Sequence, residues 1–522
     1  MAFPEILGAA FLGLLSASAG GAEPAAATPP AVLPDYSAYI LTPTPGPLPR
    51  LTGPRVFGVR PGHPVVFRVT ATGERPLTFS ADSLPSGLTL DAETGRLSGA
   101  IATAGDYRVV VHVRNARGNA ERTLRLAVGE AIALTPPLGW NSWNSWAADV
   151  DQDKILASAI AMVTTGLADH GWSYVNCDDT WEGKRGGPHH AILPNAKFPN
   201  MKALAGQIHE LGLKFGIYST PFVTTYGGYN GGTSDNPKGD WEPGPKGSGR
   251  EIGLYSFAAE DVAEWNDWGV DYLKYDWFPI DLANALAMSR ALRHGSRDIV
   301  LSLSNAAPLA EAHALQEVAQ LWRTGKDIRD EWRGPWPNQR SNQSIADIWE
   351  FHPAWRRYDG PGHWNDPDML VVGMVGWSKN LRPTHLTADE QFTHISLWCL
   401  WSAPLLIGSP LDRLDPFTLS LLTNDEVLDV DQDPLGHQAV LVAKDNLVEV
   451  WAKTLEDGSR AVGLFNRGET PETVRVTWRQ LGLEGSQPVR DLWRQQDVGV
   501  RRNGYAATVR SHGVVLVRIG VK

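Results

Sequence analysis

Between residues 134 and 430 the chain alternates apolar strand-like runs with helical stretches, and this rhythm limits the folds open to it. Helical periodicity places Ile155, Ala159 and Met162 on one face, together with Val163, and a second helical face carries Leu204, Ile208 and Leu211. Eight strand candidates lie at 135–143, 173–179, 214–220, 270–276, 298–304, 321–327, 363–370 and 404–408. Eight such units in about 300 residues predict an α/β chain with a (β/α)8 TIM barrel over 134–431, whose active site forms where the strands end.

Patterns typical of β-structure flank the barrel on both sides. Residues 51–130 alternate at period two, as in Val109, Val111 and Val113, and turn signals separate the runs, which predicts a small β-sandwich. After Gln432 the helical period ends. We expect strands of a C-terminal antiparallel β-sandwich, occupying 432–522, at 447–453, 460–466, 473–478 and 513–519.

The segment LPSGLTLDAETGRLSGA, residues 84–100, resembles the immunoglobulin-like domain of bacterial cell-surface proteins and glycosidases. The resemblance implies a spacer or adhesion module over 51–130. Residues 23–50 are rich in Ala, Pro and Thr and predict a flexible linker before it. We therefore expect the immunoglobulin-like sandwich to be an independent module.

The N-terminus predicts export. Residues 6–19 are apolar but too short to span a bilayer, and small residues follow at which a signal peptidase could cut after Ala19 or Ala22. No Lys or Arg precedes Arg50, so the positive region of a signal peptide is reduced to the terminal amine. We interpret 1–22 as a signal peptide of a periplasmic or extracellular protein, and we expect no membrane span because no other apolar run reaches about 18 residues.

Charge and cysteine content argue against nucleic-acid-binding proteins and against proteins held together by disulfides. The net charge of −11 argues against nucleic-acid binding, which needs a basic surface, and it disfavours acidic substrates for the same reason. The chain has only two cysteines, Cys177 and Cys399, so it is not held together by disulfides. Both lie in apolar runs, and we expect buried free thiols.

Acidic residues gather at the ends of the predicted strands. A TIM barrel brings such residues together at one rim, where they support either paired acid/base catalysis or a metal site. Lys274 lies two residues before Asp276, and Arg323 lies four before Asp327. An adjacent cation lowers the pKa of a carboxyl and keeps a nucleophile ionised, so we favour catalysis and expect neither a metal nor an organic cofactor. The acidic residues are Asp178, Asp179, Asp276, Asp327, Asp366 and Asp368, of which we interpret Asp366 as a structural turn residue.

Six motifs in the barrel resemble, in order and spacing, glycoside hydrolase family 27. They are PPLGWNSWN (136–144), NCDDTW (176–181), KFGIYSTP (214–221), YLKYDW (272–277), WRTGKDI (322–328) and HWNDPDML (363–370). The resemblance extends to VLDVDQDPLG (427–436) and covers about 300 residues. That family contains retaining α-galactosidases and α-N-acetylgalactosaminidases.

The resemblance implies roles for individual residues. Asp276 matches the nucleophile and Asp327 the acid/base of a retaining double displacement. Asp178 and Asp179 match the pair that binds the galactose 4- and 6-hydroxyls. The remaining matches are the aromatic platform Trp143, the pocket wall Tyr218, and the hydroxyl ligands Lys274, Arg323 and Asp368. The implied partner is an α-galactoside, with the leaving group, the pH optimum and the oligomeric state left open.

The end of the fifth strand departs from the usual pattern. In the α-galactosidases it typically ends in a Cys-Glu-Trp-like segment, whereas here it ends LSLSNAAP, residues 301–308. Ser304 and Ala307 take the positions beside the sugar's 2-substituent, and this small pair resembles the α-N-acetylgalactosaminidases. We place α-galactosidase first because Asn305 could replace the lost hydrogen bond. A third reading is a catalytically dead carbohydrate-binding or adhesion protein, against which the intact Asp276 and Asp327 argue.

Overall fold

The computed structural model describes residues 33–240, 250–334 and 342–520. The signal peptide predicted for 1–22 and the first part of the predicted linker lie outside these residues. No helix within the described ranges is long and apolar enough to cross a membrane.

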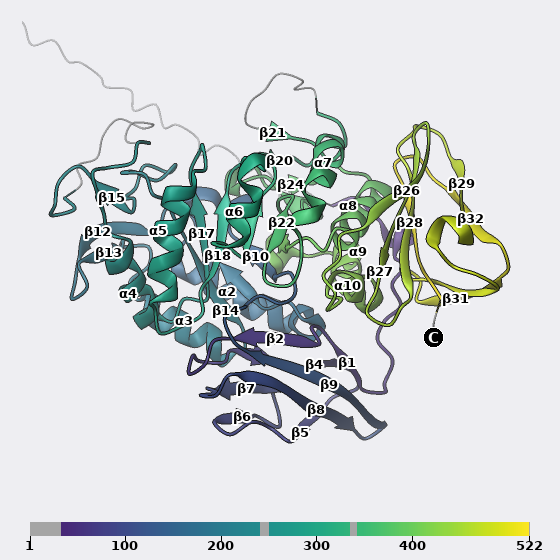
Figure 1. Cartoon of the computed structure of the whole chain (residues 1–522), viewed down its shortest axis with the longest axis horizontal. Helices are drawn as coiled ribbons and strands as arrows, with labels where there is room; N and C mark the ends of the chain where they lie inside the picture. Colours follow the sequence, from purple (N-terminus) through teal and green to yellow (C-terminus); the bar gives the residue numbers. More distant parts are fainter. Residues whose placement is uncertain (1–32, 241–249, 335–341, 521–522) are drawn as a thin grey trace, which may run out of the picture.

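Eight parallel strands form the central sheet, and each matches a predicted strand (Figure 1). Their order in the sheet is β22-β19-β18-β17-β14-β11-β10-β25. The two outer strands meet where Leu370 N donates to Leu406 O at 2.8 Å and Gly408 N donates to Leu370 O at 2.9 Å, which closes the TIM barrel. The strands are β10 (Leu138–Asn141), β11 (Tyr174–Asn176), β14 (Lys214–Ser219), β17 (Tyr272–Asp276), β18 (Val300–Ser304), β19 (Leu321–Arg323), β22 (Trp364–Asp366) and β25 (Leu405–Ile407).

One predicted strand is shorter than expected, with consequences for the site. The run 321–327 forms β19 only as far as Arg323, and Asp327 belongs to the separate two-residue strand β20 (Asp327–Ile328). The chain leaves the barrel wall at Gly325, where an added Cβ would lie 2.3 Å from Gln343 Oε1. Arg323 and Asp327 therefore do not share one strand face.

Helices surround the barrel, and their ends are set by polar side chains. Asp151, Asn200 and Asp281 cap helices by accepting from backbone N–H groups of the first turn. The helix α8 (Ala388–Leu400) is buried along nearly its whole length because β28 and β33 cover its outer side. The main helices are α2 (Gln152–Thr164), α3 (Met201–Glu210), α4 (Ala258–Trp268), α5 (Leu282–Arg293), α7 (Ile345–Phe351), α9 (Pro416–Leu422) and α10 (Asp425–Asp431).

The N-terminal domain is a sandwich of two main sheets. One sheet has the order β2-β9-β8-β5 and the other the order β3-β7-β6. Val109, Val111 and Val113 are buried between them, as their spacing predicts. The strands are β1 (Arg50–Thr52), β2 (Val56–Val59), β3 (Phe67–Arg68), β4 (Thr70–Thr72), β5 (Thr78–Asp82), β6 (Leu88–Leu90), β7 (Arg96–Gly99), β8 (Gly105–Asn115) and β9 (Gly118–Val128).

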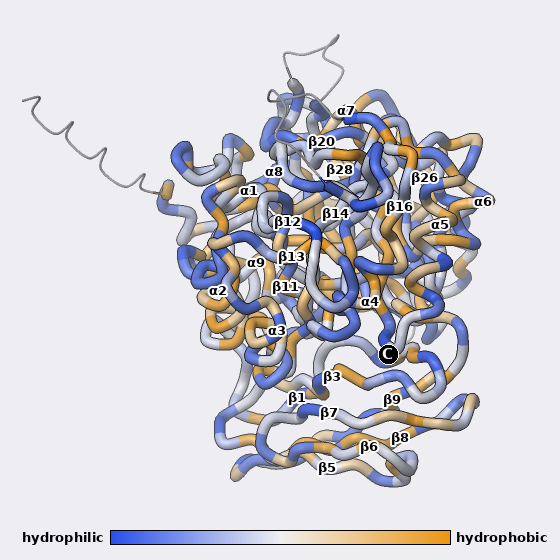
Figure 2. The backbone as a smooth tube through the Cα atoms, turned by 90° about the vertical axis from the view of Figure 1, so that its left-hand side faces the viewer, coloured by the Kyte–Doolittle hydropathy of each residue, from blue (hydrophilic) through white to orange (hydrophobic). Residues whose placement is uncertain are grey.

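This N-terminal sandwich is docked on the barrel, which differs from the independent module expected from sequence. It forms a layer beneath the barrel (Figure 2). Arg60 Nε lies 2.6 Å from Asp298 Oδ1, and Arg68 Nη2 lies 2.9 Å from Asp169 Oδ1. Both pairs are largely buried and both join the sandwich to the barrel. Periodicity identified the sandwich but could not show that its charged residues have partners in the barrel.

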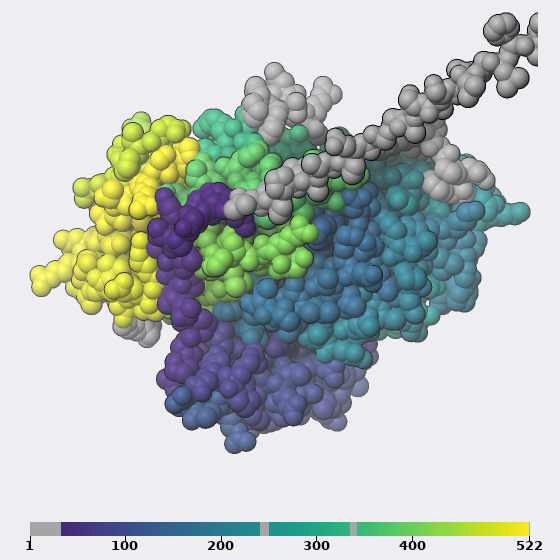
Figure 3. Space-filling view, turned by 180° about the vertical axis from the view of Figure 1, so that it is seen from behind, coloured from purple at the N-terminus to yellow at the C-terminus, as the bar shows by residue number. Residues whose placement is uncertain are grey.

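The described part of the predicted linker also lies against the barrel. Tyr36 packs on Phe417 with ring centroids 5.0 Å apart, and Thr42 Oγ1 donates to Ser420 O at 2.8 Å. From behind, the segment is seen running over the barrel surface down to the N-terminal sandwich (Figure 3). Residues 33–49 thus follow a defined path.

The C-terminal sandwich pairs a six-stranded antiparallel sheet, β26-β27-β28-β33-β30-β31, with the two strands β29 and β32. Its core includes Val450, Val462 and Val517. The strands are β26 (Val440–Asp445), β27 (Val448–Thr454), β28 (Arg460–Asn466), β29 (Glu472–Thr477), β30 (Gln487–Asp491), β31 (Gln496–Arg501), β32 (Gly504–Val509) and β33 (Val514–Ile519), and four of them lie where the pattern predicted.

Candidate active site

A cavity of about 350 Å³ opens at the carboxyl ends of the barrel strands. Nine of the eleven residues predicted for the site line it, and Ser304 and Ala307 do not. The nine are Trp143, Asp178, Asp179, Tyr218, Lys274, Asp276, Arg323, Asp327 and Asp368. The convergence of carboxylates that strand ends predict is therefore present.

Two consecutive carboxylates, Asp178 and Asp179, both reach the cavity, which a continuing strand would not allow because neighbouring side chains alternate between faces. The strand β11 ends at Asn176, and Thr180 has a φ of 88°, a strained value for a β-branched residue. Buried Glu182 accepts from Thr180 N at 2.9 Å, and Lys197 Nζ donates to Thr180 Oγ1 at 2.9 Å. These contacts hold the turn that aims both carboxylates inward.

The carboxyl of Asp179 keeps one oxygen without a protein partner among the described residues. Its Oδ2 accepts from Gly227 N at 2.6 Å, whereas its Oδ1 is buried and unpaired there. The Tyr218 hydroxyl on β14 is likewise buried without a hydrogen-bond partner in that part of the chain. Burial raises the pKa of Asp179 to about 6. Buried polar atoms facing a cavity are suited to bind hydroxyl groups of a ligand.

Lys274 and Asp276 occupy alternate positions of β17 and both face the cavity. Lys274 Nζ donates to Asp178 Oδ2 at 2.9 Å and lies 5.6 Å from the centre of the Tyr218 ring. The ammonium therefore joins the second and fourth strands across the rim. The carboxylate to which Lys274 donates is that of Asp178.

Asp276 is buried, and its Oδ1 accepts a hydrogen bond from the Asn305 side-chain amide. Burial raises the pKa of Asp276 to about 7, and Lys274 and Arg323 offset this only in part, while Asp327 and Asp178 add to the rise. Lys274 lowers this pKa, as expected, but desolvation of a nearly inaccessible carboxyl outweighs a cation already paired with Asp178, so the net change is a rise.

Asp327 lies at the mouth of the cavity, with 58% of its side chain exposed. Arg323 Nη2 is 3.4 Å from Asp327 Oδ1 and 2.8 Å from Asp368 Oδ2, so one buried guanidinium contacts both carboxylates. Asp368 Oδ2 also accepts from Ile328 N at 2.8 Å, which fixes the loop after Asp327. Asp366 stays outside the cavity lining and accepts from Asp368 N at 2.8 Å, in keeping with a turn role.

The cavity is lined at the end of β18 by Asn305, where Ser304 and Ala307 were predicted. Asn305 has a φ of 66°, a left-handed conformation that Asn tolerates better than most residues. The reversal directs its amide to Asp276, while Ser304 and Ala307 are buried behind it. A single residue with a positive φ leaves no periodic signal in the sequence.

Several lining residues were not singled out from the sequence. Lys326 and Arg329 flank Asp327 along the chain, and that adjacency was the available signal. Asn144, Ile328 and Met369 lie within the quoted motifs, whereas no pattern marks Tyr226, Phe278 and Trp377, which come from other barrel loops.

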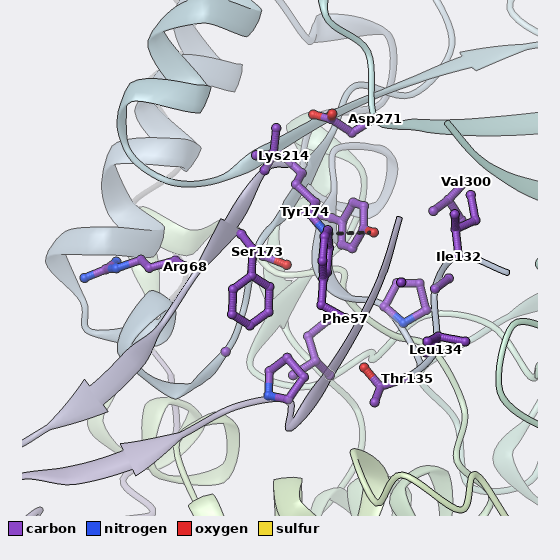
Figure 4. Close-up of a pocket in the computed structure, with 18 of the residues that line it drawn as sticks. Phe57, Arg68, Ile132, Leu134, Thr135, Ser173, Tyr174, Lys214, Asp271 and Val300 are labelled. Atoms are coloured by element: carbon purple, nitrogen blue, oxygen red, sulfur yellow. Dashed lines mark hydrogen bonds between the residues drawn. The ribbon is translucent and has the colours of Figure 1, made fainter. Parts of the chain in front are cut away.

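A second cavity, of about 90 Å³, lies at the opposite end of the barrel, between the barrel and the N-terminal sandwich. Figure 4 shows Lys214 beside Tyr174 and Phe57: its Nζ donates to Tyr174 Oη at 3.2 Å and lies 5.0 Å from the Phe57 ring centre. The carboxylates along this cavity, Asp271 and Asp298, are paired with His209 and Arg60. We interpret it as a cavity of the domain interface, since the active sites of TIM barrels lie at the carboxyl ends of the strands, which is the other end of the barrel.

Two further features concern the cysteines and the grouping of possible metal ligands in the described ranges. Cys177 and Cys399 are buried free thiols, as predicted. No group of three or more His, Cys, Asp or Glu side chains in the described ranges is arranged to hold a metal ion.

Comparisons with known proteins agree with this geometry. The family model described as alpha galactosidase A matches residues 135–240 and 244–433, and the alpha galactosidase C-terminal beta sandwich domain matches 445–519. An Ig-domain model matches 48–129. The α-galactosidase of Coffea arabica is 36% identical over 410 residues, covering 76% of this chain and 96% of its own.

Two solved structures extend the comparison. A candidate α-galactosidase from Bacteroides fragilis has a TM-score of 0.81 and 32% identity, covering 91% of this chain and 98% of its own. A family 27 β-L-arabinopyranosidase from Geobacillus stearothermophilus has a TM-score of 0.64 and 29% identity, covering 74% and 97%. Because a family model matches more than half of its residues, the chain belongs to the α-galactosidases of glycoside hydrolase family 27, and an immunoglobulin-like domain precedes its barrel in sequence.

Proposed function

We propose that this protein is an α-galactosidase that releases terminal α-linked galactose with retention of configuration. The observation that carries the proposal is the pairing of a buried carboxyl, Asp276, with an exposed one, Asp327, on the same cavity. A nucleophile has to be held in place, and an acid/base has to reach both the leaving oxygen and water. The relatives named α-galactosidase support the choice of reaction.

In the first step Asp276 attacks the anomeric carbon as the bond to the leaving oxygen breaks, and the proton of Asp327 passes to that oxygen. In the second step Asp327 takes a proton from water, whose oxygen forms a bond to the anomeric carbon as the bond to Asp276 breaks. Arg323 contacts Asp327 and Asp368 and holds the acid/base on the side of the leaving group.

Sugar recognition is assigned to the floor of the cavity. Asp178 and Asp179, oriented by the turn at Thr180, bind the 4- and 6-hydroxyls, and the unpaired Asp179 Oδ1 and Tyr218 hydroxyl accept or donate further bonds. Trp143, at the start of α1 (Trp143–Trp146), is the platform under the ring. No step of this reaction needs a metal or an organic cofactor.

The 2-position separates galactose from N-acetylgalactosamine. Asn305 lines the cavity where the usual glutamate is missing, and its amide offers a hydrogen-bonding group toward a 2-hydroxyl. The test is kcat/KM on nitrophenyl α-galactoside and nitrophenyl α-N-acetylgalactosaminide. We expect the galactoside to be preferred. A tenfold preference for the acetamido sugar, worth about 1.4 kcal/mol, would assign the protein to the other activity.

We also propose that the protein is exported. The apolar segment 6–19 and the small residues up to Ala22 support this. Sequencing the N-terminus of the protein recovered from outside the cytoplasm tests it, with a start at residue 20 or 23 expected. A chain that stays in the cytoplasm and retains Met1 contradicts export.

A further inference from the structure

The mouth of the cavity carries two cations that the reaction does not use. Lys326 and Arg329 lie on either side of Asp327 in sequence, and both line the cavity. Neither forms an ion pair with any carboxylate of the described residues. The next carboxylate along the chain, Asp330, is buried and paired with Arg382 at 2.6 Å.

Deeper in the cavity two acidic groups are paired with cations, and burial raises the pKa of Asp179, which has no cation partner among the described residues, to about 6. Asp178 is paired with Lys274, Asp368 is paired with Arg323, and burial raises the pKa of Asp276 to about 7. On the floor of the cavity Asp178 and Asp368 are thus offset by cations, whereas the mouth holds Lys326 and Arg329 against the single carboxyl of Asp327. This local distribution is opposite to the net charge of −11, from which acidic substrates were disfavoured.

Arg329 lies against an aromatic side chain from another loop. The guanidinium carbon lies 4.5 Å from the centre of the Trp377 ring, and Arg329 Nε donates to the neutral Asn342 Oδ1 at 2.9 Å. Neither contact neutralises the positive charge. Among the described residues no group accepts from the other guanidinium donors of Arg329.

Trp377 is itself fixed in an uncommon conformation. Its φ is 59° and that of Ser378 is 66°, two consecutive left-handed residues that are not glycine. The backbone N–H groups of Gly376 and Trp377 both donate to Asn144 O, at 3.2 and 3.0 Å. Strain retained at a cavity in this way is typical of functional positions.

Lys326, Arg329 and Trp377 lie close to Asp327, and this position indicates which part of a substrate they face. The acid/base has to touch the oxygen between galactose and the leaving group, so residues beside it lie on the leaving-group side. Trp377 supplies an apolar face for a ring there, and Lys326 and Arg329 supply positive charge.

We propose that Lys326, Arg329 and Trp377 form a leaving-group subsite for an acidic sugar, one that carries a carboxylate or a sulfate. This inference rests on the proposed α-galactosidase activity and names the class of substrate it acts on. The anion binds to Lys326 and Arg329 while the ring lies against Trp377.

The test compares three disaccharides with the same α-linkage: galactose linked to galacturonic acid, to galactose, and to galactose 6-sulfate. At low salt we expect kcat/KM for at least one acidic disaccharide to exceed that for the neutral one by about tenfold, the effect of two partly exposed ion pairs. The acidic sugar that is preferred identifies the anion. The preference should fall toward unity in 0.5 M NaCl because salt screens exposed charges.

Variants assign the preference to these residues. Lys326→Met and Arg329→Gln should each lower the ratio of acidic to neutral kcat/KM. Lys326→Arg keeps the positive charge and should keep the ratio of the parent. Lys202→Met, an exposed residue on α3 outside the cavity, is the matched control and should leave the ratio unchanged. Equal or lower kcat/KM for both acidic disaccharides overturns the inference. Failure to hydrolyse nitrophenyl α-galactoside would instead overturn the proposed function, so the two failures are distinguishable.

Discussion

Lys274 donates to Asp178 at 2.9 Å, although Asp276 is its nearest carboxylate along the strand. The ammonium thereby fixes a residue assigned to sugar binding, and it stays close enough to lower the pKa of Asp276 without overcoming burial. Asp276 accepts a hydrogen bond from Asn305 instead. One lysine thus links the sugar-binding pair to the reaction centre.

The two carboxyl groups should respond differently to removal. Asp276→Ala should abolish turnover of every substrate because no other carboxylate can form the covalent intermediate. Asp327→Ala should keep measurable activity on aryl galactosides, whose leaving groups need no proton. Steady-state kinetics on nitrophenyl α-galactoside and on a disaccharide separate the two. Near-normal kcat in Asp276→Ala would show that another residue is the nucleophile.

The raised pKa of Asp276 predicts a pH dependence of activity. The nucleophile acts as the anion, so kcat/KM should rise as pH increases through about 7, the pKa of this carboxyl. A pH profile of kcat/KM measures this in the free enzyme. A rising limb near pH 4 would show that the carboxyl titrates with its ordinary pKa.

The Asp276 carboxyl should also make the stability of the fold depend on pH. Stability should fall as pH rises, whereas a salt-bridged carboxylate makes it increase. The folded state holds the Asp276 proton up to about pH 7, whereas an unfolded Asp releases it near its ordinary value of 3.8, so stability is lost as pH rises between the two. Asp276→Asn removes this loss, and its melting temperature should exceed that of the parent at pH 8 but match it near pH 4. A constant difference across this range would contradict the linkage.

The strained turn at Thr180 should depend on Glu182. Burial raises the pKa of Glu182 well above its usual range, and its carboxyl accepts from Thr180 N at 2.9 Å. Glu182→Ala should lower kcat/KM on nitrophenyl α-galactoside by about tenfold, since the strain of such a residue is of order 1–3 kcal/mol. Glu182→Gln retains the acceptor and is the matched control. Equal loss in both variants would mean that the acceptor is not what orients Asp178 and Asp179.

The contact between the N-terminal sandwich and the barrel should matter for stability and not for catalysis. Asp298→Ala leaves the buried Arg60 guanidinium without its carboxylate and should lower the free energy of unfolding by on the order of 2 kcal/mol. Because this contact is at the end of the barrel opposite the active site, kcat/KM should not change. Thermal unfolding and kinetics on one preparation test both statements, and Glu311→Ala, exposed on the barrel surface, is the control.

Much of the fold follows from local pattern. The eight barrel strands, the two sandwiches and the buried thiols were predictable because burial on one face imposes a period on the chain, and strand ends bring Asp178, Asp276 and Asp368 to one rim. The length of β19 was not predictable, since the chain turns away from the barrel at Gly325, where Gln343 and Phe351 leave no room for a Cβ.

The amino-acid sequence by itself determined which residue types arrive at the carboxyl ends of the strands. Tertiary structure decided which of them meet. Lys274 has Asp178 as its partner, Asn305 enters the cavity in place of Ser304, Trp377 faces Arg329 from a distant loop, and Arg60 binds Asp298 across two domains. Period and propensity act over a few residues, whereas ion pairs, desolvation and backbone reversals depend on neighbours tens to hundreds of residues away, which only the packed chain brings together.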